Sequence, residues 1–167
     1  MLDHAGFALT QLDRLQGFFG RIESKSSFLF AVNLGLLGST AATTLVGQLW
    51  SLHGACSAVT GALLTFSMFN LYAAFYPHLR GAPQSSLLYF GDVSRLSAAD
   101  FSAKVKALTP EDLADDALCQ VWRNSEILRK KFDRTRSAFI LTGAAVPFWL
   151  VALMLTVAHD GKFPSFH

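Results

Sequence analysis

Long stretches without charge dominate the pattern of hydrophobic and polar positions along the chain. No Asp, Glu, Lys or Arg occurs between Ser26 and Leu79 or between Ser137 and His159, and a polar turn at Ser51 to Gly54 divides the first stretch. At about 1.5 Å of rise per residue, a helix of just over twenty residues reaches roughly the 30 Å of a bilayer's hydrocarbon core. The pattern predicts three transmembrane helices, at 28–50, 55–76 and 137–158.

The composition supports a membrane protein. Of the 167 residues, 51% are hydrophobic and 16% are charged, and the mean hydropathy of +0.35 lies above that of an ordinary soluble domain. The chain length suits one compact bundle rather than a multi-domain enzyme. We therefore predict an all-α membrane protein, in which three transmembrane helices carry cytoplasmic helical extensions.

Basic residues indicate which side of the membrane each connection faces, because Lys and Arg accumulate in cytoplasmic loops. Of the 14 basic residues, all but Lys162 precede the first span or lie between Arg80 and Arg136. The distribution predicts a multi-pass protein with a cytoplasmic N-terminus. A signal peptide is the alternative for the first span, since Arg21 and Lys25 precede it, but the amphipathic residues ahead of them argue against one.

The residues before the first span predict an amphipathic helix, because apolar side chains recur there at steps of four and three. This helix either lies on the membrane surface or continues straight into the first span and packs on a cytoplasmic partner. The expected order of segments is a cytoplasmic amphipathic helix at 1–26, a transmembrane hairpin at 27–76, a cytoplasmic helical ligand-sensing segment at 77–136, the third transmembrane helix at 137–158 and a short outer tail at 159–167.

Two helix starts are predicted within the segment 77–136. Ser97 has the position of an N-cap for a short helix. Thr109 followed by Pro110 predicts a second start, and no helix breaker occurs after it until Pro147. One long helix is therefore expected from Pro110 through the third span, with a kink at Pro147.

Polar and small residues inside the spans predict how the spans pack. Asn33 and Asn70 lie at similar depth, so their amides are expected to hydrogen-bond to each other as a polar clamp, and a role in conduction or gating is the alternative. Small residues at four-residue spacing let helices approach closely in lipid and allow self-association. These stripes comprise Gly35, Ser39, Thr43 and Gly47 in the first span and Ser57, Gly61 and Thr65 in the second.

The sequence carries no recognisable catalytic or metal-binding motif. None of the common phosphate-loop, dinucleotide, hydrolase or metalloprotease signatures occurs, and 2 cysteines and 5 histidines show no metal-ligand spacing. We predict that the chain is not an enzyme and uses no metal or cofactor. Its sequence pI of about 8.7 reflects the basic flanks of the spans rather than a nucleic-acid surface.

The segment between Arg80 and Arg136 is equipped to hold an anion. It combines cations with aromatic side chains and amides, which supply what a phosphate and a flat base require. The alternative is that the same cations only flank a span and attract anionic lipid headgroups.

Four stretches in a fixed order carry a resemblance to a known family. They are RIESKSSFLFAVNLGLL at the first span, YPHLRG after the second, LLYFGDV in the loop and QVWRNSEILRKKFDRTRSAF before the third. With these stretches the chain, from about Arg21 to Leu155, resembles the transmembrane effectors of the Pycsar anti-phage systems. The resemblance implies a cytoplasmic receptor region for cUMP or cCMP, coupled to spans that impair the bacterial inner membrane when ligand binds.

The resemblance also implies candidate ligand-binding residues, most of which have a structural alternative. The candidates are Lys25, Arg80 and Lys131 for phosphate or charge balance, Asn124 and Asp92 for hydrogen bonds to base or ribose, and Phe90 or Trp122 for stacking. Anchoring at the interface is the alternative for Lys25, an ion pair for Asp92, and packing for the amide and the aromatic rings. The implied partners are the lipid bilayer, the cyclic mononucleotide, further copies of the chain in a homo-oligomer, and a cognate nucleotidyl cyclase acting through its product; no nucleic acid is expected.

Two further expectations concern mechanism and function class. We predict a pocket formed partly between subunits, so that the nucleotide drives assembly through the small-residue stripes. The rival function is a three-span structural or accessory subunit that scaffolds a larger membrane complex and binds no nucleotide.

Overall fold

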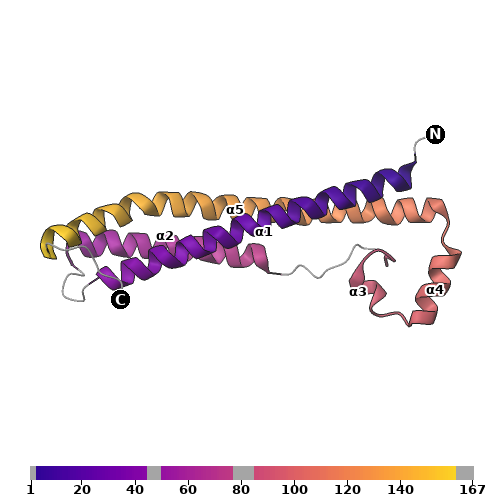
Figure 1. Ribbon diagram of the computed structural model, residues 1–167, viewed down its shortest axis with the longest axis horizontal. Coiled ribbons are helices and arrows are strands. Elements are labelled where there is room, and N and C mark those ends of the chain that lie inside the picture. The colour runs from indigo at the N-terminus through magenta and orange to yellow at the C-terminus, as the bar shows by residue number, and fades with distance from the viewer. Residues whose placement is uncertain (1–2, 45–49, 77–84, 161–167) are drawn as a thin grey trace. The chain divides into compact units, whose positions relative to one another are not determined.

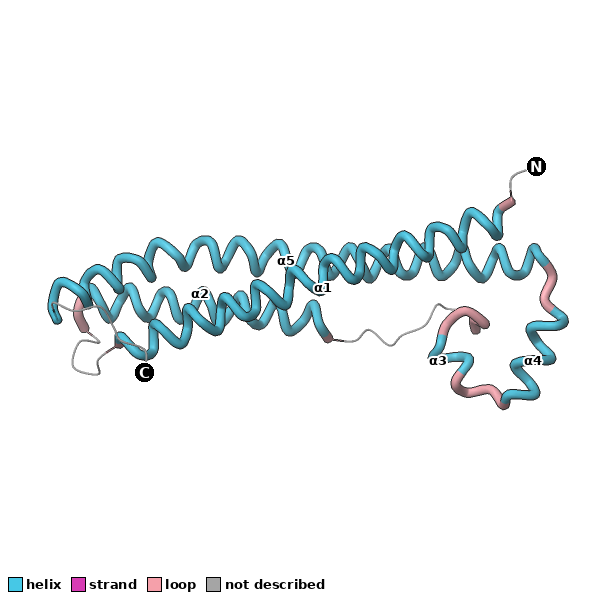
Figure 2. Tube along the Cα trace, in the orientation of Figure 1, coloured by secondary structure: helices cyan, strands magenta, loops and turns pink. Residues whose placement is uncertain are grey.

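The computed structural model describes residues 3–44, 50–76 and 85–160, and within these residues it contains helices and no strand (Figures 1 and 2). Helices account for 89% of them, which confirms the all-α prediction. Three of the helices are long and apolar enough to cross a membrane, as the hydrophobic pattern predicted. The helices are α1 (His4–Thr43), α2 (Leu52–Phe75), α3 (Phe90–Val93), α4 (Ala98–Ala107) and α5 (Pro110–Asp160).

The chain divides into two compact units. One, here called the head unit, comprises Met1–Ile22 and Tyr76–Lys131, and the other, the span unit, comprises Glu23–Phe75 and Phe132–His167. α1 and α5 each contribute residues to both units. α1 is one helix from His4 to Thr43, so the N-terminal amphipathic segment continues straight into the first span.

The predicted helix starts and the long last helix are confirmed. Ser97 caps α4, its side chain accepting a hydrogen bond from the backbone N–H of Asp100. The Thr109 hydroxyl accepts a hydrogen bond of 3.1 Å from the backbone N–H of Asp112 in the first turn of α5. From there α5 continues without interruption to Asp160, with Pro147 inside it.

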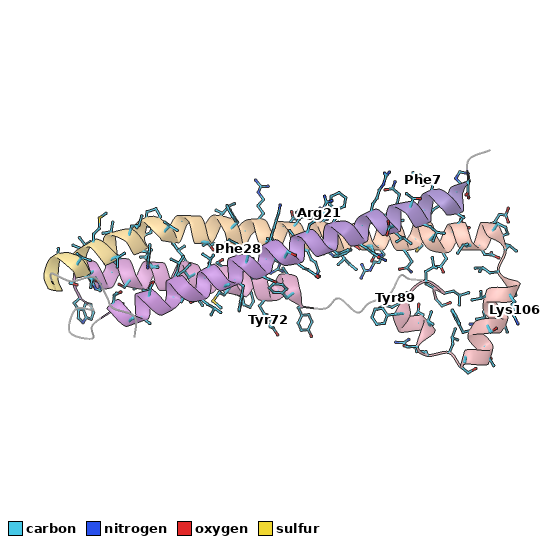
Figure 3. The ribbon with its side chains drawn as sticks, viewed as in Figure 1. Phe7, Arg21, Phe28, Tyr72, Tyr89 and Lys106 are labelled. Carbon is cyan, nitrogen blue, oxygen red and sulfur yellow. The ribbon has the colours of Figure 1, made fainter. Side chains whose placement is uncertain are left out.

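Most side chains inside the span unit are small or polar, with a few leucines among them, and large aromatic side chains lie outside. Buried positions of α2 recur at steps of four and three, the period of a helix that packs along a straight seam: His53, Ser57, Thr60, Leu64, Ser67, Leu71 and Ala74. Phe28 and Tyr72, both labelled in Figure 3, and Phe139 have rings that are 62–73% exposed. This arrangement suits lipid, where close approach of small residues, rather than burial of large apolar ones, holds helices together.

A buried polar triad connects all three helices of the span unit. The Asn33 side chain of α1, which is fully buried, donates from Nδ2 to Ser67 Oγ of α2 at 2.7 Å. Its Oδ1 accepts from Thr142 Oγ1 of α5 at 2.8 Å. Ser67 Oγ in turn donates to the backbone carbonyl of Ala138 at 2.9 Å. Each of the three helices is therefore bonded to the other two at one level.

Further polar pairs tie the helices at other levels of the same unit. Ser26 and Thr135 share a hydrogen bond of 2.8 Å between their hydroxyls. Trp149 Nε1 donates to Ser39 Oγ at 2.8 Å, and His53 Nε2 lies 2.9 Å from Thr156 Oγ1. Because a polar group facing hydrocarbon without a partner is costly, these pairs fix which faces of the helices meet.

The predicted clamp between Asn33 and Asn70 is wrong. Asn70 donates from Nδ2 to the backbone carbonyl of Phe66 in its own helix, at 2.9 Å. Equal depth does not suffice for pairing, because the two side chains must also share a face. Leu71, which is fully buried, occupies the seam position at that level, and Asn70 falls on the flank of the seam.

The predicted four-residue stripes lie only partly on the packing surface of the span unit. Thr43 and Ser57 are buried and Ser39 and Gly61 are partly buried, whereas Gly35 and Thr65 are exposed. Gly47 lies outside the described residues. A strict step of four advances about 40° around a helix each time, since successive residues are about 100° apart. Only part of each stripe therefore stays on the contact surface, whereas positions at alternating steps of four and three remain on it.

Replacing Asn33 with alanine is expected to lower the free energy of unfolding in detergent by about 1–3 kcal/mol, because both hydrogen bonds of the amide are lost inside the bundle. A denaturant titration followed by circular dichroism measures this change. Asn70→Ala is the matched control and should change the stability by less than about 0.5 kcal/mol. Equal losses in the two variants would show that the triad does not stabilise the bundle.

Candidate functional site

Carboxylates hold the loop before α3 in place within the head unit. The Asp92 carboxylate accepts a hydrogen bond from the backbone N–H of Ser86 at 3.0 Å, and Asp116 of α5 accepts one from the backbone N–H of Leu87 at 2.9 Å. The Ser86 hydroxyl accepts from the backbone N–H groups of Leu88 and Tyr89. These bonds fix the backbone of the loop that carries Leu88, Tyr89 and Phe90.

Gly91 lets an aromatic ring lie directly over the backbone at the start of α3. A methyl group added at Gly91 would lie 2.5 Å from Cε1 of the Tyr89 ring, a separation at which the ring would have to move. Tyr89 and Phe90 also contact each other, with ring centroids 5.0 Å apart, and Figure 3 shows the Tyr89 ring beside α3. Gly91 of the FGD stretch therefore leaves free the space that the Tyr89 ring occupies.

A cavity of about 320 Å³, here called the amide cavity, lies among α1, the loop before α3 and α5 of the head unit. Its volume is near the lower end of the range of about 300–1,000 Å³ typical of small-molecule sites. Apolar and aromatic side chains form most of its wall, and three carboxamides interrupt them. The lining residues are Leu12, Leu15, Gln16, Phe19, Leu88, Tyr89, Phe90, Gln120 and Asn124.

Lys131 places a positive charge next to this cavity. Its ammonium nitrogen lies 5.7 Å from the centre of the Phe19 ring, which lines the cavity. Two further cations of α5, Lys130 and Arg123, pair with Glu126 at 2.9 Å and 2.7 Å. Hydrogen bonds from Lys130 and then from Arg123 lower the pKa of the Glu126 carboxyl.

A second cavity of the head unit, of about 480 Å³, is strongly acidic. Four aspartates line it, Asp92, Asp112, Asp115 and Asp116, with one cation, Lys104. Hydrogen bonds from the side chain and then the backbone of Thr109 lower the pKa of Asp112. At neutral pH this cavity repels anions, whereas the amide cavity has no carboxylate among its lining residues.

The structure brings together three of the candidate residues from the sequence. Phe90 and Asn124 line the amide cavity, and Lys131 lies against its wall through Phe19. Asp92 lines the acidic cavity instead. Lys25 is an exposed residue of the span unit, and Arg80 lies outside the described residues. Trp122 is 62% exposed and is not among the residues that line either cavity.

Sequence reasoning missed three lining residues that carry chemistry: Gln16, Phe19 and Gln120. A signal for one of them was present, because Gln120 precedes Asn124 by four positions and such residues share a face of a helix. The apolar seam of α1 contained Phe19 but gave no sign of a cavity beside it. Tyr89 adjoins Phe90 in the sequence, and only the hydrogen-bonded loop shows that both rings face the same site.

The sequence was compared with known proteins. A family model described as the Pycsar effector protein domain matches residues 7–158, a range that includes the lining residues of both cavities and the polar triad. No curated protein and no solved structure matches the chain.

Replacing Thr109 with valine is expected to raise the pKa of the Asp112 carboxyl toward its ordinary value, because the hydroxyl that donates the stronger stabilising hydrogen bond is lost, while the backbone N–H of residue 109 remains. The stability linked to this lowered pKa is present above the pKa of Asp112 in the unfolded chain and disappears as pH falls through the folded value. An NMR titration of the carboxyl carbon measures the shift, with Ser102→Ala on the exposed face of α4 as control. Coincident titration curves for Thr109→Val and wild type would contradict the assignment.

Proposed function

The chain belongs to the family of Pycsar effector proteins, multi-pass anti-phage membrane effectors, and we propose that it binds cUMP or cCMP in the amide cavity of its head unit and then impairs the membrane. The observation that carries the proposal is the composition of the cavity wall. Aromatic rings offer a base a flat apolar face, and carboxamides offer directed hydrogen bonds. Two of the residues that the family resemblance singled out, Phe90 and Asn124, are in this wall.

Electrostatics favour the amide cavity over the larger acidic one. A cyclic mononucleotide carries one negative charge on its phosphodiester, and the four aspartates around the larger cavity oppose that charge. Lys131 lies beside the amide cavity instead, where it supplies a counter-charge. We assign the phosphate to the Lys131 side and the base to the amides.

Asp92 acts in this proposal through the loop and not through the ligand. Its carboxylate holds the backbone N–H of Ser86 at 3.0 Å, which fixes the loop carrying Tyr89 and Phe90. Loss of Asp92 therefore displaces the aromatic wall of the cavity without removing a ligand contact. Arg80 and Lys25 keep their proposed roles as sources of positive charge, on the resemblance alone.

The response reaches the membrane along the chain itself, because α1 and α5 each continue from the head unit into the span unit. A ligand shifts the balance between resting and active states only by its difference in affinity for them. We propose that the nucleotide favours a homo-oligomeric state in which the spans are rearranged and the bacterial inner membrane leaks. The distribution of Lys and Arg supports a cytoplasmic head unit and N-terminus, the side on which a cognate cyclase releases its product.

The full chain in detergent is expected to bind cUMP or cCMP at micromolar or lower concentration, and cAMP and cGMP at least tenfold more weakly. Asn124→Ala should weaken pyrimidine binding about tenfold by removing one hydrogen-bonding group. Ser125→Ala is the matched control, since Ser125 is exposed on the next position of α5 and bonds only to Val121 of its own helix. Isothermal titration calorimetry measures all three proteins.

A functional measurement accompanies the binding. In liposomes, the same nucleotide should release a trapped dye from vesicles containing the wild type and the Ser125→Ala variant, and release less from those containing Asn124→Ala. Failure of both pyrimidine nucleotides to bind the wild type would refute the proposed function. Stoichiometric co-purification of another membrane protein would then favour the scaffold alternative.

A further inference from the structure

Among the described residues of the head unit, one buried side-chain atom has no hydrogen-bond partner. The Gln120 side chain is 5% exposed, and its amide nitrogen makes no hydrogen bond. The other buried side-chain atoms without partners, among the residues that the structure describes, belong to His53, Ser57 and Thr60 in the span unit. Gln120 lines the amide cavity, so the unpaired amide lies at the wall of a space large enough for a ligand.

An unpaired amide in such a place indicates a missing partner. Buried donors in folded proteins are almost always hydrogen-bonded, because leaving one unpaired costs free energy. Leucine has a similar volume and would complete the apolar wall formed by Leu12, Leu15 and Leu88 without that cost. Packing alone therefore gives no reason for glutamine at this position, whereas a ligand that pairs with the amide gives one.

We infer that Gln120 reads the edge of the pyrimidine base, an inference that rests on the proposed nucleotide binding. A carboxamide presents an N–H donor beside a carbonyl acceptor, the combination with which glutamine pairs bidentately with a base edge. Uracil offers O4 and N3–H side by side, and cytosine offers N3 and its exocyclic amino group in the opposite order. Rotation of the carboxamide by a half turn matches either base, so Gln120 accepts both pyrimidines.

The test pairs a change in the protein with a change in the ligand. N3-methyl-cUMP lacks the N3–H donor, and Gln120→Leu lacks the amide. We expect wild type to bind N3-methyl-cUMP about tenfold more weakly than it binds cUMP. Gln120→Leu should bind the two ligands with equal affinity, about tenfold below the affinity of wild type for cUMP. Competition calorimetry with the full chain in detergent gives the four affinities.

A stability measurement separates base reading from a structural role. Because the amide is unpaired without ligand, Gln120→Leu should melt at the same or a higher temperature than wild type when no nucleotide is present, despite its weaker binding. Gln11→Leu is the matched control, since Gln11 is half-buried on α1 but does not line the cavity. This control should keep the tenfold preference of wild type for cUMP over its N3-methyl analogue.

The outcomes distinguish the two proposals. If wild type binds neither cUMP nor cCMP, the proposed function and the role of Gln120 both fail. If wild type binds cUMP but the penalties of Gln120→Leu and of N3-methylation add independently, the proposed function stands and base reading by Gln120 is refuted. A lower melting temperature of Gln120→Leu with unchanged nucleotide affinity would likewise refute it, because the amide would then be a structural group.

Discussion

Asn33 supplies the span unit with contacts that the hydrophobic effect cannot provide inside lipid. Lipid tails surround an apolar side chain as well as another helix does, so helices associate there through close packing and hydrogen bonds. The Asn33 carboxamide has both a donor and an acceptor, and it uses one on Ser67 of α2 and the other on Thr142 of α5. The small hydroxyl residues along the rest of the seam let the three backbones come close enough for the amide to reach.

In the head unit, aspartates hold the backbone of the loop before α3, and carboxamides line the amide cavity. Asp92 and Asp116 bond to backbone N–H groups of the loop before α3, so their charges face the acidic cavity and hold the loop from that side. The other side of the loop presents Leu88, Tyr89 and Phe90 to the amide cavity. The two cavities consequently differ in electrostatic character although one short loop contributes to both. This difference decides which of them suits an anionic ligand.

The sequence predicted the helices well because their signals are local. Uncharged stretches of sufficient length indicated the three spans, and Ser97 and Thr109 indicated the helix starts that the structure confirms. Contacts between helices were predicted less well. The depth of a residue in the membrane follows from its position along the helix. The partner of Asn33 depends also on which face of each helix points inward. Ser67 lies on the inward face of α2 and bonds to Asn33, whereas Asn70 does not.

The candidate site was predictable only in its outline. Phe90 and Asn124 were identified through a resemblance to a family, and the structure places both in one cavity wall. Gln120 stood out neither by charge nor by motif, because its significance lies in a hydrogen bond that it does not make. Such a property exists only once the surrounding atoms are in place.

The close contact between Gly91 and the Tyr89 ring bears on how inactive mutants are to be interpreted. Any side chain at position 91 must push that ring aside, so a substitution there alters the cavity wall although the residue itself is not among those that line it. A genetic screen for phage-sensitive alleles would recover such changes alongside true contact residues. A second substitution that replaces Tyr89 with a smaller residue would restore activity to a Gly91 variant but not to a variant that has lost a ligand contact.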